Sequence, residues 1–130
     1  MTAQVRGTGS VRIVSGKWRR SVIAVPVAEG LRPTSERVRE TVFDWLTHLF
    51  GTLDGCAVLD MFAGSGAMGF EAASRGADIV HWVDVNKQGI AGIQAGLKRL
   101  GADANKKAFV SDVFRFLQQA KAPYDLILID

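Results

Sequence analysis

The sequence CAVLDMFAGSGAMG, residues 56–69, joins an apolar run to a glycine-rich turn. The run leads into the carboxylate of Asp60, and Gly64, Gly66 and Gly69 have the G-x-G-x-x-G spacing found between a strand and a helix in nucleotide-binding folds. The three glycines there permit a tight turn, a close approach of the backbone to a ligand, and close packing of helix on strand. This stretch therefore predicts a nucleotide-like ligand at the carboxyl end of a strand.

An apolar run followed by an acid occurs three more times. Asp84 closes the second run, Asp112 follows the third, and Asp130 follows the fourth, Leu126–Ile129. Helical periodicity separates the runs, so we expect an α/β fold of the Rossmann-like type, a parallel sheet with helices on both faces. The expected strands are Cys56–Met61, Ile79–Val83, Lys107–Val110 and Tyr124–Ile129, and the expected helices are Ala67–Arg75, Lys87–Leu100 and Val113 to about Gln119.

A smaller basic segment precedes this domain. Val11–Val14 and Val22–Val25 are β-prone runs around a loop with glycine and basic residues, which predicts a hairpin. We expect a flexible tail at 1–10, a basic hairpin and connector at 11–33, and the α/β domain at 34–130. Thr34 or Ser35 is the expected cap of a first helix, whose apolar face repeats every three or four residues and ends near Phe50-Gly51.

Composition narrows the class of protein. The 130 residues are 48% hydrophobic and 22% charged, which is typical of one soluble globular domain. No apolar run reaches the roughly 20 residues that span a bilayer, and the N-terminus lacks the apolar core of a secretory signal. Cys56 is the single cysteine, so no disulfide can form within the chain. We expect a cytoplasmic protein that does not enter a membrane.

The charge is uneven along the chain. Residues 1–40 carry eight basic and three acidic side chains, a net charge of +5, whereas residues 41–130 carry eight basic and ten acidic ones, a net charge of −2. A basic segment attached to a slightly acidic domain is typical of a protein with a polyanionic partner such as RNA. His48 and His81 have no metal-ligand neighbours in the sequence, so no metal site is predicted.

The acids favour S-adenosylmethionine over a dinucleotide. Asp60 lies four residues before Gly64, where it would repel a pyrophosphate but attract the ammonium or sulfonium of S-adenosylmethionine. This argues against a dehydrogenase. Asp84, 20 positions after Gly64, can accept hydrogen bonds from ribose hydroxyls. Asp112 can bind the adenine amino group, cap the following helix, or do both.

Asp60 to Gly66 resembles motif I of the class I methyltransferases that modify exocyclic amines. The fuller resemblance is to the bacterial RsmD-type methyltransferases of the guanine N2 amine in 16S ribosomal RNA. It runs from about Val11 to Asp130, and its N-terminal matches are Arg12 to Arg19, Leu31-Arg32-Pro33-Thr34 and Arg37-Val38-Arg39-Glu40-Thr41-Val42-Phe43. Of these, the Leu-Arg-Pro-Thr and Arg-Val-Arg-Glu segments are specific to the family. The glycine motif alone is not specific to this family.

The resemblance implies a seven-stranded sheet of order 3-2-1-4-5-7-6, with S-adenosylmethionine as cofactor and 16S ribosomal RNA, or a small-subunit assembly intermediate, as partner. It also implies an Asn- or Asp-Pro-Pro-aromatic motif after the fourth strand, of which this chain holds only the first residue, Asp130. Asp130 is the candidate catalytic carboxylate that would hold the guanine amine. The candidate cofactor-binding residues are Asp60, Phe62, Ala63, Gly64, Ser65, Gly66, Asp84, Val85, Asp112 and Val113.

The candidate RNA-binding residues belong to the basic segment: Arg12, Lys17, Trp18, Arg19, Arg20, Arg32, Arg37 and Arg39. For Trp18 the alternative is a local hydrophobic anchor, and for Arg37 and Arg39 it is a plain surface position on the helix. Two other functions stay open: methylation of adenine N6 in DNA or RNA, and binding of cofactor or RNA without catalysis. We expect the whole protein to be a monomer, and the 130-residue chain to self-associate or be marginally stable because its fourth strand has an open edge.

Overall fold

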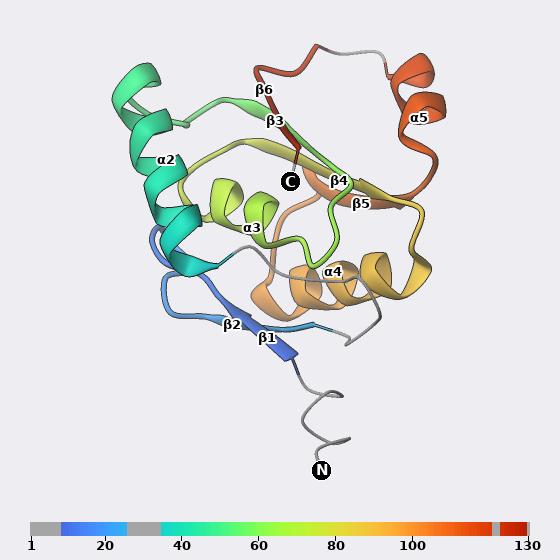
Figure 1. Cartoon of the computed structure of the whole chain (residues 1–130), viewed down its shortest axis with the longest axis horizontal. Helices are drawn as coiled ribbons and strands as arrows, with labels where there is room; N and C mark the ends of the chain where they lie inside the picture. The colour runs from blue at the N-terminus through green and yellow to red at the C-terminus, as the bar shows by residue number, and fades with distance from the viewer. Residues whose placement is uncertain (1–8, 26–34, 121–122, 130) are drawn as a thin grey trace.

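The computed structural model describes residues 9–25, 35–120 and 123–129. A parallel four-stranded sheet has the order β5-β4-β3-β6, and a separate two-stranded antiparallel sheet is formed by β1 and β2 (Figure 1). The strands are β1 (Gly9–Arg12), β2 (Val22–Val25), β3 (Ala57–Met61), β4 (Ile79–Asp84), β5 (Lys106–Val110) and β6 (Leu126–Ile129); the helices are α2 (Glu36–Phe50), α3 (Ala67–Ser74), α4 (Lys87–Leu100) and α5 (Val113–Gln119).

This arrangement confirms the expected α/β class. The parallel strands lie in the order 3-2-1-4 of their succession along the chain, which is the first part of the order that the resemblance implied. Sequence and structure differ at the first strand: β1 begins at Gly9, inside the expected tail, and ends at Arg12. It stops early because the amides of Val14 and Ser15 donate to Glu71 on α3.

Helices cover both faces of the parallel sheet. Side chains of alternate strand residues such as Val80 and Trp82 join Phe70 of α3 and Ile93 of α4 in the main hydrophobic cluster. Neighbouring residues point to the other face, where Val83 packs with Val113 of α5. Because successive side chains alternate between two covered faces, the central strands β3 and β4 are mostly apolar, with Asp60 and His81 as the polar exceptions before the acid that ends β4.

Helix α2 begins where the sequence places its cap. Ser35 has an extended backbone and its side chain accepts a hydrogen bond from the amide of Val38, while Glu36 lies in the positively polarised first turn. The helix packs on α3 through Phe43, whose side chain is fully buried. The expected tail before Gly9, Arg32 and Asp130 lie outside the described residues.

Candidate functional site

The glycine turn follows β3 at the carboxyl edge of the parallel sheet. Phe62, Gly64 and Gly66 all have positive φ, at 56°, 59° and 84°, so the chain bends sharply within five residues. For Phe62 this left-handed conformation is unusual and costs energy, and its ring is half-exposed beside the turn. A non-glycine residue held in this region at the expected ligand position is a feature typical of functional sites.

Neither Gly66 nor Gly69 has space for a side chain; Gly69 allows the expected close packing of helix on strand, whereas Gly66, expected to let a ligand approach, lies against Ile93 of α4. Gly66 caps α3, and a Cβ there would lie 2.7 Å from Cγ1 of Ile93. A Cβ on Gly69 would lie 2.2 Å from Nε1 of Trp82, and this same Nε1 donates a hydrogen bond to the carbonyl of Gly66 at 3.0 Å. The indole of Trp82 therefore holds the glycine turn through this hydrogen bond, and the indole can reach the carbonyl of Gly66 only because position 69 is a glycine.

Asp60 lies under the turn. Its Oδ2 accepts a hydrogen bond from the amide of Gly69 at 2.9 Å, and the residue is only 1% exposed. The attraction of a cationic ligand that the sequence predicts for this carboxylate stays a prediction, and because the side chain is buried it would act across the backbone of the turn. Its negative charge lies behind the backbone of the turn, where it still favours a cation and disfavours a phosphate on the open side.

Asp84 ties the end of β4 to the turn. Its Oδ2 accepts a hydrogen bond from the amide of Gly64, and its Oδ1 accepts one from the amide of Asn86, both at 2.9 Å. Asn86 in turn caps α4 by accepting from the amide of Gly89. Each carboxylate oxygen has a second lone pair, so the half-buried Asp84 can also accept from ligand hydroxyls. Val85, which follows, is exposed.

Asp112 stands at the end of β5 on the same edge. The backbone joins the two strand ends, because the amide of Ser111 donates to the carbonyl of Asp84. The Oδ1 of Asp112 accepts from the amides of Phe114 and Arg115, which confirms its expected role as the cap of α5. Both amides donate to the same oxygen, so the cap does not use the lone pairs of Oδ2. Val113 is buried and anchors α5 to the sheet.

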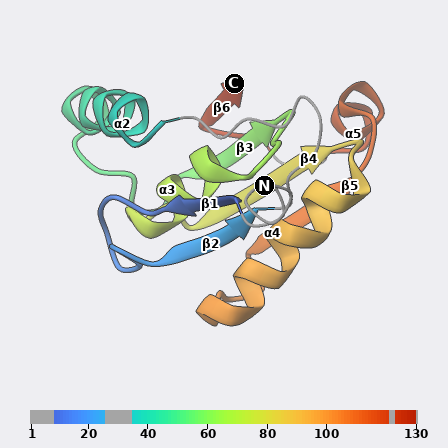
Figure 2. The same ribbon diagram turned by 60° about the horizontal axis from the view of Figure 1, so that its bottom comes forward.

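The basic loop of the hairpin lies beside the carboxyl end of α3, at the far end of this helix from the glycine turn. The amide of Lys17 donates to the carbonyl of Ser74, and the amide of Trp18 donates to its hydroxyl. Ser74 ends α3, whose eight residues span about 12 Å from the glycine turn. Figures 1 and 2 both show the loop beside the amino ends of the parallel strands. Arg19 and Arg20 are exposed there, far from the three acids.

The side chains of Trp18 and Arg39 pack against the protein and are not free on its surface. The Trp18 ring is partly buried against the main cluster, with Nζ of Lys17 at 4.9 Å from the ring centroid, so it is the local anchor that the sequence allowed as an alternative. Arg39 is 1% exposed and paired with Glu71, so the expectation that it binds RNA is wrong. Arg12 and Arg37 are exposed, with Arg12 paired to Glu36.

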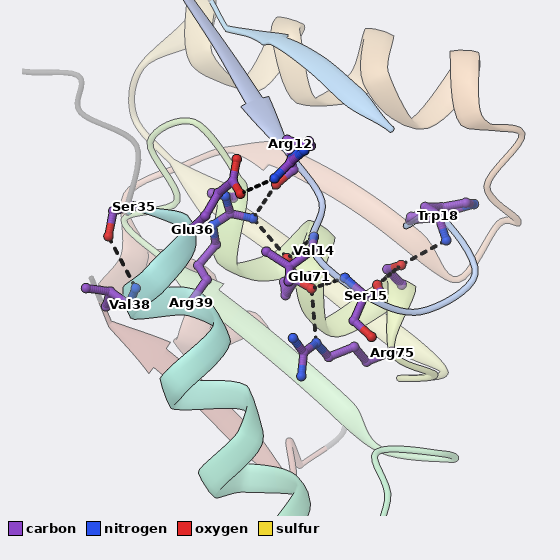
Figure 3. Close-up of polar contacts among 12 residues, drawn as sticks. Arg12, Val14, Ser15, Trp18, Ser35, Glu36, Val38, Arg39, Glu71 and Arg75 are labelled. Atoms are coloured by element: carbon purple, nitrogen blue, oxygen red, sulfur yellow. Dashed lines mark hydrogen bonds and ion pairs between the residues drawn. The ribbon is translucent and has the colours of Figure 1, made fainter. Parts of the chain in front are cut away.

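Sequence reasoning missed Glu71 and Ser74, which hold the basic segment on α3. Figure 3 shows the contacts of Glu71. The signal was present in the composition of α3, where Glu71 is the single charged residue among small and apolar neighbours. A helix that is apolar all round is buried, so its one acid has to be paired.

A cavity of about 610 Å³ lies on the α5 face, beside His81, Phe109 and Tyr124. The hydroxyl of Tyr124 lies 2.6 Å from Nδ1 of His81. Burial, followed by the nearby charge of Lys107, lowers the pKa of His81, and burial raises the pKa of Tyr124. Both shifts favour uncharged side chains in this layer.

Among the described residues there is no group of three His, Cys, Asp or Glu side chains that could hold a metal ion. A search of the same residues for a helix long and apolar enough to cross a membrane finds none. Burial raises the pKa of the Cys56 thiol, with smaller contributions from Asp125 and Asp54. This keeps the thiol in its unreactive protonated form.

The fold and the edge of acids around a glycine turn define a domain of the class I S-adenosylmethionine-dependent methyltransferase type. A family model described as "Conserved hypothetical protein 95" matches residues 11–130, and the chain belongs to this family.

Sequence identity to named relatives supports this family membership. The chain is 37% identical over 124 residues to ribosomal RNA small subunit methyltransferase D of Escherichia coli K12, covering 95% of this chain and 61% of the relative. It is 36% identical over 128 residues to the protein of the same name in Haemophilus influenzae, covering 94% and 63%. The chain thus spans somewhat under two thirds of the length of these relatives.

Solved structures share the fold. The yhhF protein of Escherichia coli, a methyltransferase candidate, has a TM-score of 0.79 at 37% identity, covering 92% of this chain and 62% of that one. SMU.776, a methyltransferase candidate complexed with SAH, has a TM-score of 0.67 at 25% identity, covering 93% and 31%.

Proposed function

We propose that the protein binds S-adenosylmethionine at the carboxyl edge of β3, β4 and β5 and methylates the N2 amine of a guanine in 16S ribosomal RNA. The observation that carries this proposal is the glycine turn tethered to Asp84 in a chain that is 37% identical, over 95% of its length, to a ribosomal RNA small subunit methyltransferase. The small ribosomal subunit or an assembly intermediate is the proposed partner, in the cytoplasm.

The geometry of the edge supports this cofactor. The turn from Phe62 to Gly66 would take the amino-acid part of the ligand, the second lone pairs of Asp84 would take the ribose hydroxyls, and Oδ2 of Asp112 would take the adenine amine. Ala63, Ser65, Val85 and Val113 complete the proposed surroundings. The bound cofactor would supply an electrophilic methyl group on a sulfonium. The buried charge of Asp60 suits such a cation and argues against a pyrophosphate.

The proposed acceptor is a weak nucleophile, because the lone pair of the exocyclic nitrogen is delocalised into the guanine ring. A carboxylate that accepts a hydrogen bond from this amine would orient it and stabilise the positive charge that develops during transfer. We assign this role to Asp130 on the basis of the family resemblance. The base would have to leave its helix to reach the edge of the sheet.

The exposed basic residues would bind RNA phosphates. Arg12 and Arg37 lie around the start of α2, while Lys17, Arg19 and Arg20 lie at the far edge. Contacts at the far edge would fall on RNA some distance from the methylated base. Arg32 keeps its proposed role from the resemblance.

Transfer of a labelled methyl group by the full-length protein tests the proposal. We expect incorporation into small-subunit RNA and none into duplex DNA, with N2-methylguanosine as the product in nucleoside mass spectrometry. N6-methyladenosine would show instead an adenine methyltransferase. Cofactor binding without transfer to any nucleic acid would show a binding protein without catalysis.

A further inference from the structure

The carboxylate of Glu71 is buried in the middle of α3 and fully used. Its Oε1 accepts hydrogen bonds from the amide of Val14 at 3.0 Å and from Nη1 of Arg39 at 2.9 Å. Its Oε2 accepts from the amide of Ser15 and from Nε of Arg75, both at 3.0 Å. Four donors meet the four lone-pair positions of a carboxylate that is 0% exposed (Figure 3). We call these five residues the Glu71 cluster.

The cluster joins three parts of the chain that are distant in sequence. Val14 and Ser15 belong to the hairpin, Arg39 to α2, and Glu71 to the helix that starts at the glycine turn. Arg39 also donates to the carbonyl of Arg12 at 2.9 Å, so one guanidinium contacts both the hairpin and α3. The basic N-terminal segment is thus tied, through the buried pair of Arg39 and Glu71, to the helix that starts at the proposed cofactor edge.

The hairpin runs alongside α3 with a fixed offset. Val14 and Ser15 contact a residue 57 and 56 positions further along, and Trp18 contacts one 56 positions further along. Val11 packs on Ala67 near the glycine turn, and Lys17 donates to Ser74 at the other end of the helix. The segment 11–18 therefore has one register on α3, from the turn to the far edge.

A buried ion pair is a poor way to add stability, because apolar side chains of similar volume often do as well or better. Apolar contacts alone would let the hairpin settle in several positions along α3. A carboxylate with four directed donors accepts only one, since any shift leaves a buried charge or amide without its partner. The Glu71 cluster is therefore better explained as fixing the register of the hairpin on α3 than as increasing the free energy of unfolding.

We propose that Glu71 is a positioning residue that sets the place of the RNA-binding segment relative to the cofactor turn. This inference rests on the proposed function. Glu71 touches neither the turn nor the exposed arginines, so its loss should spare cofactor binding and misplace the RNA. Small misplacements of a substrate can lower a rate strongly, because the reacting atoms no longer meet in line.

The test uses Glu71→Gln in the full-length protein, with Glu40→Gln, an exposed glutamate of α2, as the matched control. We expect cooperative melting, a Kd for S-adenosylmethionine within about threefold of wild type, and a kcat/KM for RNA lowered at least about tenfold. In Glu40→Gln all three should stay at wild-type values. A parallel loss of cofactor binding and methylation in Glu71→Gln, or no change in methylation, would overturn the inference.

A second readout keeps the inference testable if the wild-type protein methylates no RNA, which would defeat the proposed function itself. Hydrogen exchange of the amides of Val14, Ser15, Lys17 and Trp18 should accelerate together in Glu71→Gln while the Kd for S-adenosylmethionine is kept. Unchanged exchange would refute the fixed register. If Glu71→Gln does not fold, Arg39→Lys takes its place, because lysine keeps the charge but lacks the planar fork of donors. For Arg39→Lys we expect the same lowered kcat/KM for RNA and the same faster amide exchange, with the Kd for S-adenosylmethionine kept. Wild-type values of kcat/KM and of amide exchange would overturn the inference.

Discussion

At the scale of single residues, the three acids that close the strands have different surroundings and hence different roles. Asp60 is buried against the first turn of α3, Asp84 bridges the glycine turn and the start of α4, and Asp112 caps α5 on the exposed side. The chain uses each carboxylate first to order backbone amides. For Asp84 and Asp112, which are not buried, the remaining lone pairs would be left for a ligand, whereas Asp60 is enclosed by the protein.

Asp84→Asn should weaken cofactor binding. The amide side chain keeps one acceptor oxygen but loses the charge, so it cannot serve Gly64, Asn86 and two ribose hydroxyls together. Because hydrogen bonds to a charged group contribute roughly 1.5–3 kcal/mol, we expect the Kd for S-adenosylmethionine to rise about tenfold or more. Isothermal titration calorimetry measures it, with the exposed Asp103→Asn as the control. Equal affinity for all three proteins would contradict the proposed role.

Gly69→Ala should destabilise the fold. The added Cβ would lie 2.2 Å from Nε1 of Trp82, so the indole must move and give up its bond to Gly66. Overpacking of this kind costs about 1–3 kcal/mol in the free energy of unfolding, which denaturant titration measures. The double variant Gly69→Ala, Trp82→Leu should lose less than the sum of the two single losses, because leucine makes room for the methyl group. Strict additivity would show that the two residues do not interact.

At the scale of elements, sequence periodicity located every described helix and strand to within a few residues, because each covers a face or layer of one core. It could not show that the strand at Val11 would end at Arg12, since that depends on Glu71, nearly 60 residues away. It also placed Arg39 on the surface, because a charged neighbourhood at the start of a helix gives no sign of a buried partner. Long-range pairing of charges is invisible to a pattern of local spacing.

The layer between α5 and the sheet should respond to pH through His81. Burial lowers its pKa below the ordinary value of 6.5 for histidine, so the unfolded chain takes up this proton before the folded one does as the pH falls. The stability that neutral His81 contributes is thus present above pH 6.5 and lost as the pH falls from there through the lowered pKa. We expect the difference in Tm between pH 7.5 and about pH 5.5 to be smaller in His81→Phe than in wild type. His48→Gln, at an exposed position of α2, should keep the wild-type difference, and an unchanged difference in His81→Phe would exclude this histidine as the source.

A substitution in the hairpin loop should weaken RNA binding and leave cofactor binding unchanged. Arg19 is exposed in the loop beside the carboxyl end of α3, away from the glycine turn, so Arg19→Ser should remove the proposed phosphate contact and leave the cofactor site unchanged. We expect a weaker affinity for RNA and a salt dependence lowered by about one counterion. Fluorescence anisotropy at several salt concentrations measures both. Arg115→Ser, on α5, serves as the control, and equal slopes for both variants would argue against RNA contact by the loop.

At the scale of the whole molecule, β6 is an edge strand of the parallel sheet and lies next to exposed apolar side chains. Within the described residues it pairs only with β3, and Ile127 and Ile129 are 47% and 69% exposed. Helix α2 adds Trp45 and Leu49, which are also largely exposed. Strand edges of this kind pair readily with other chains.

The 130-residue chain by itself should therefore self-associate. Size-exclusion chromatography with light scattering should show species larger than a monomer, and Ile127→Lys should shift them toward the monomer because a charged edge resists strand pairing. Val22→Lys, at a similarly exposed strand position in the hairpin, should have no such effect. A wild-type chain that runs as a monomer at every concentration tested would disprove this prediction.

The constant offset between the hairpin and α3 has a consequence for how this protein can change in length. Inserting or deleting a single residue within 11–18 or 67–74 would shift one part of the segment against the other, so the contacts of Val11, Val14, Ser15, Lys17 and Trp18 could not all be kept. Substitutions there can be absorbed one at a time, whereas a change of length cannot. Extra residues would be tolerated at the exposed Gly51 and Thr52, which follow α2 outside this alignment and precede the buried Leu53.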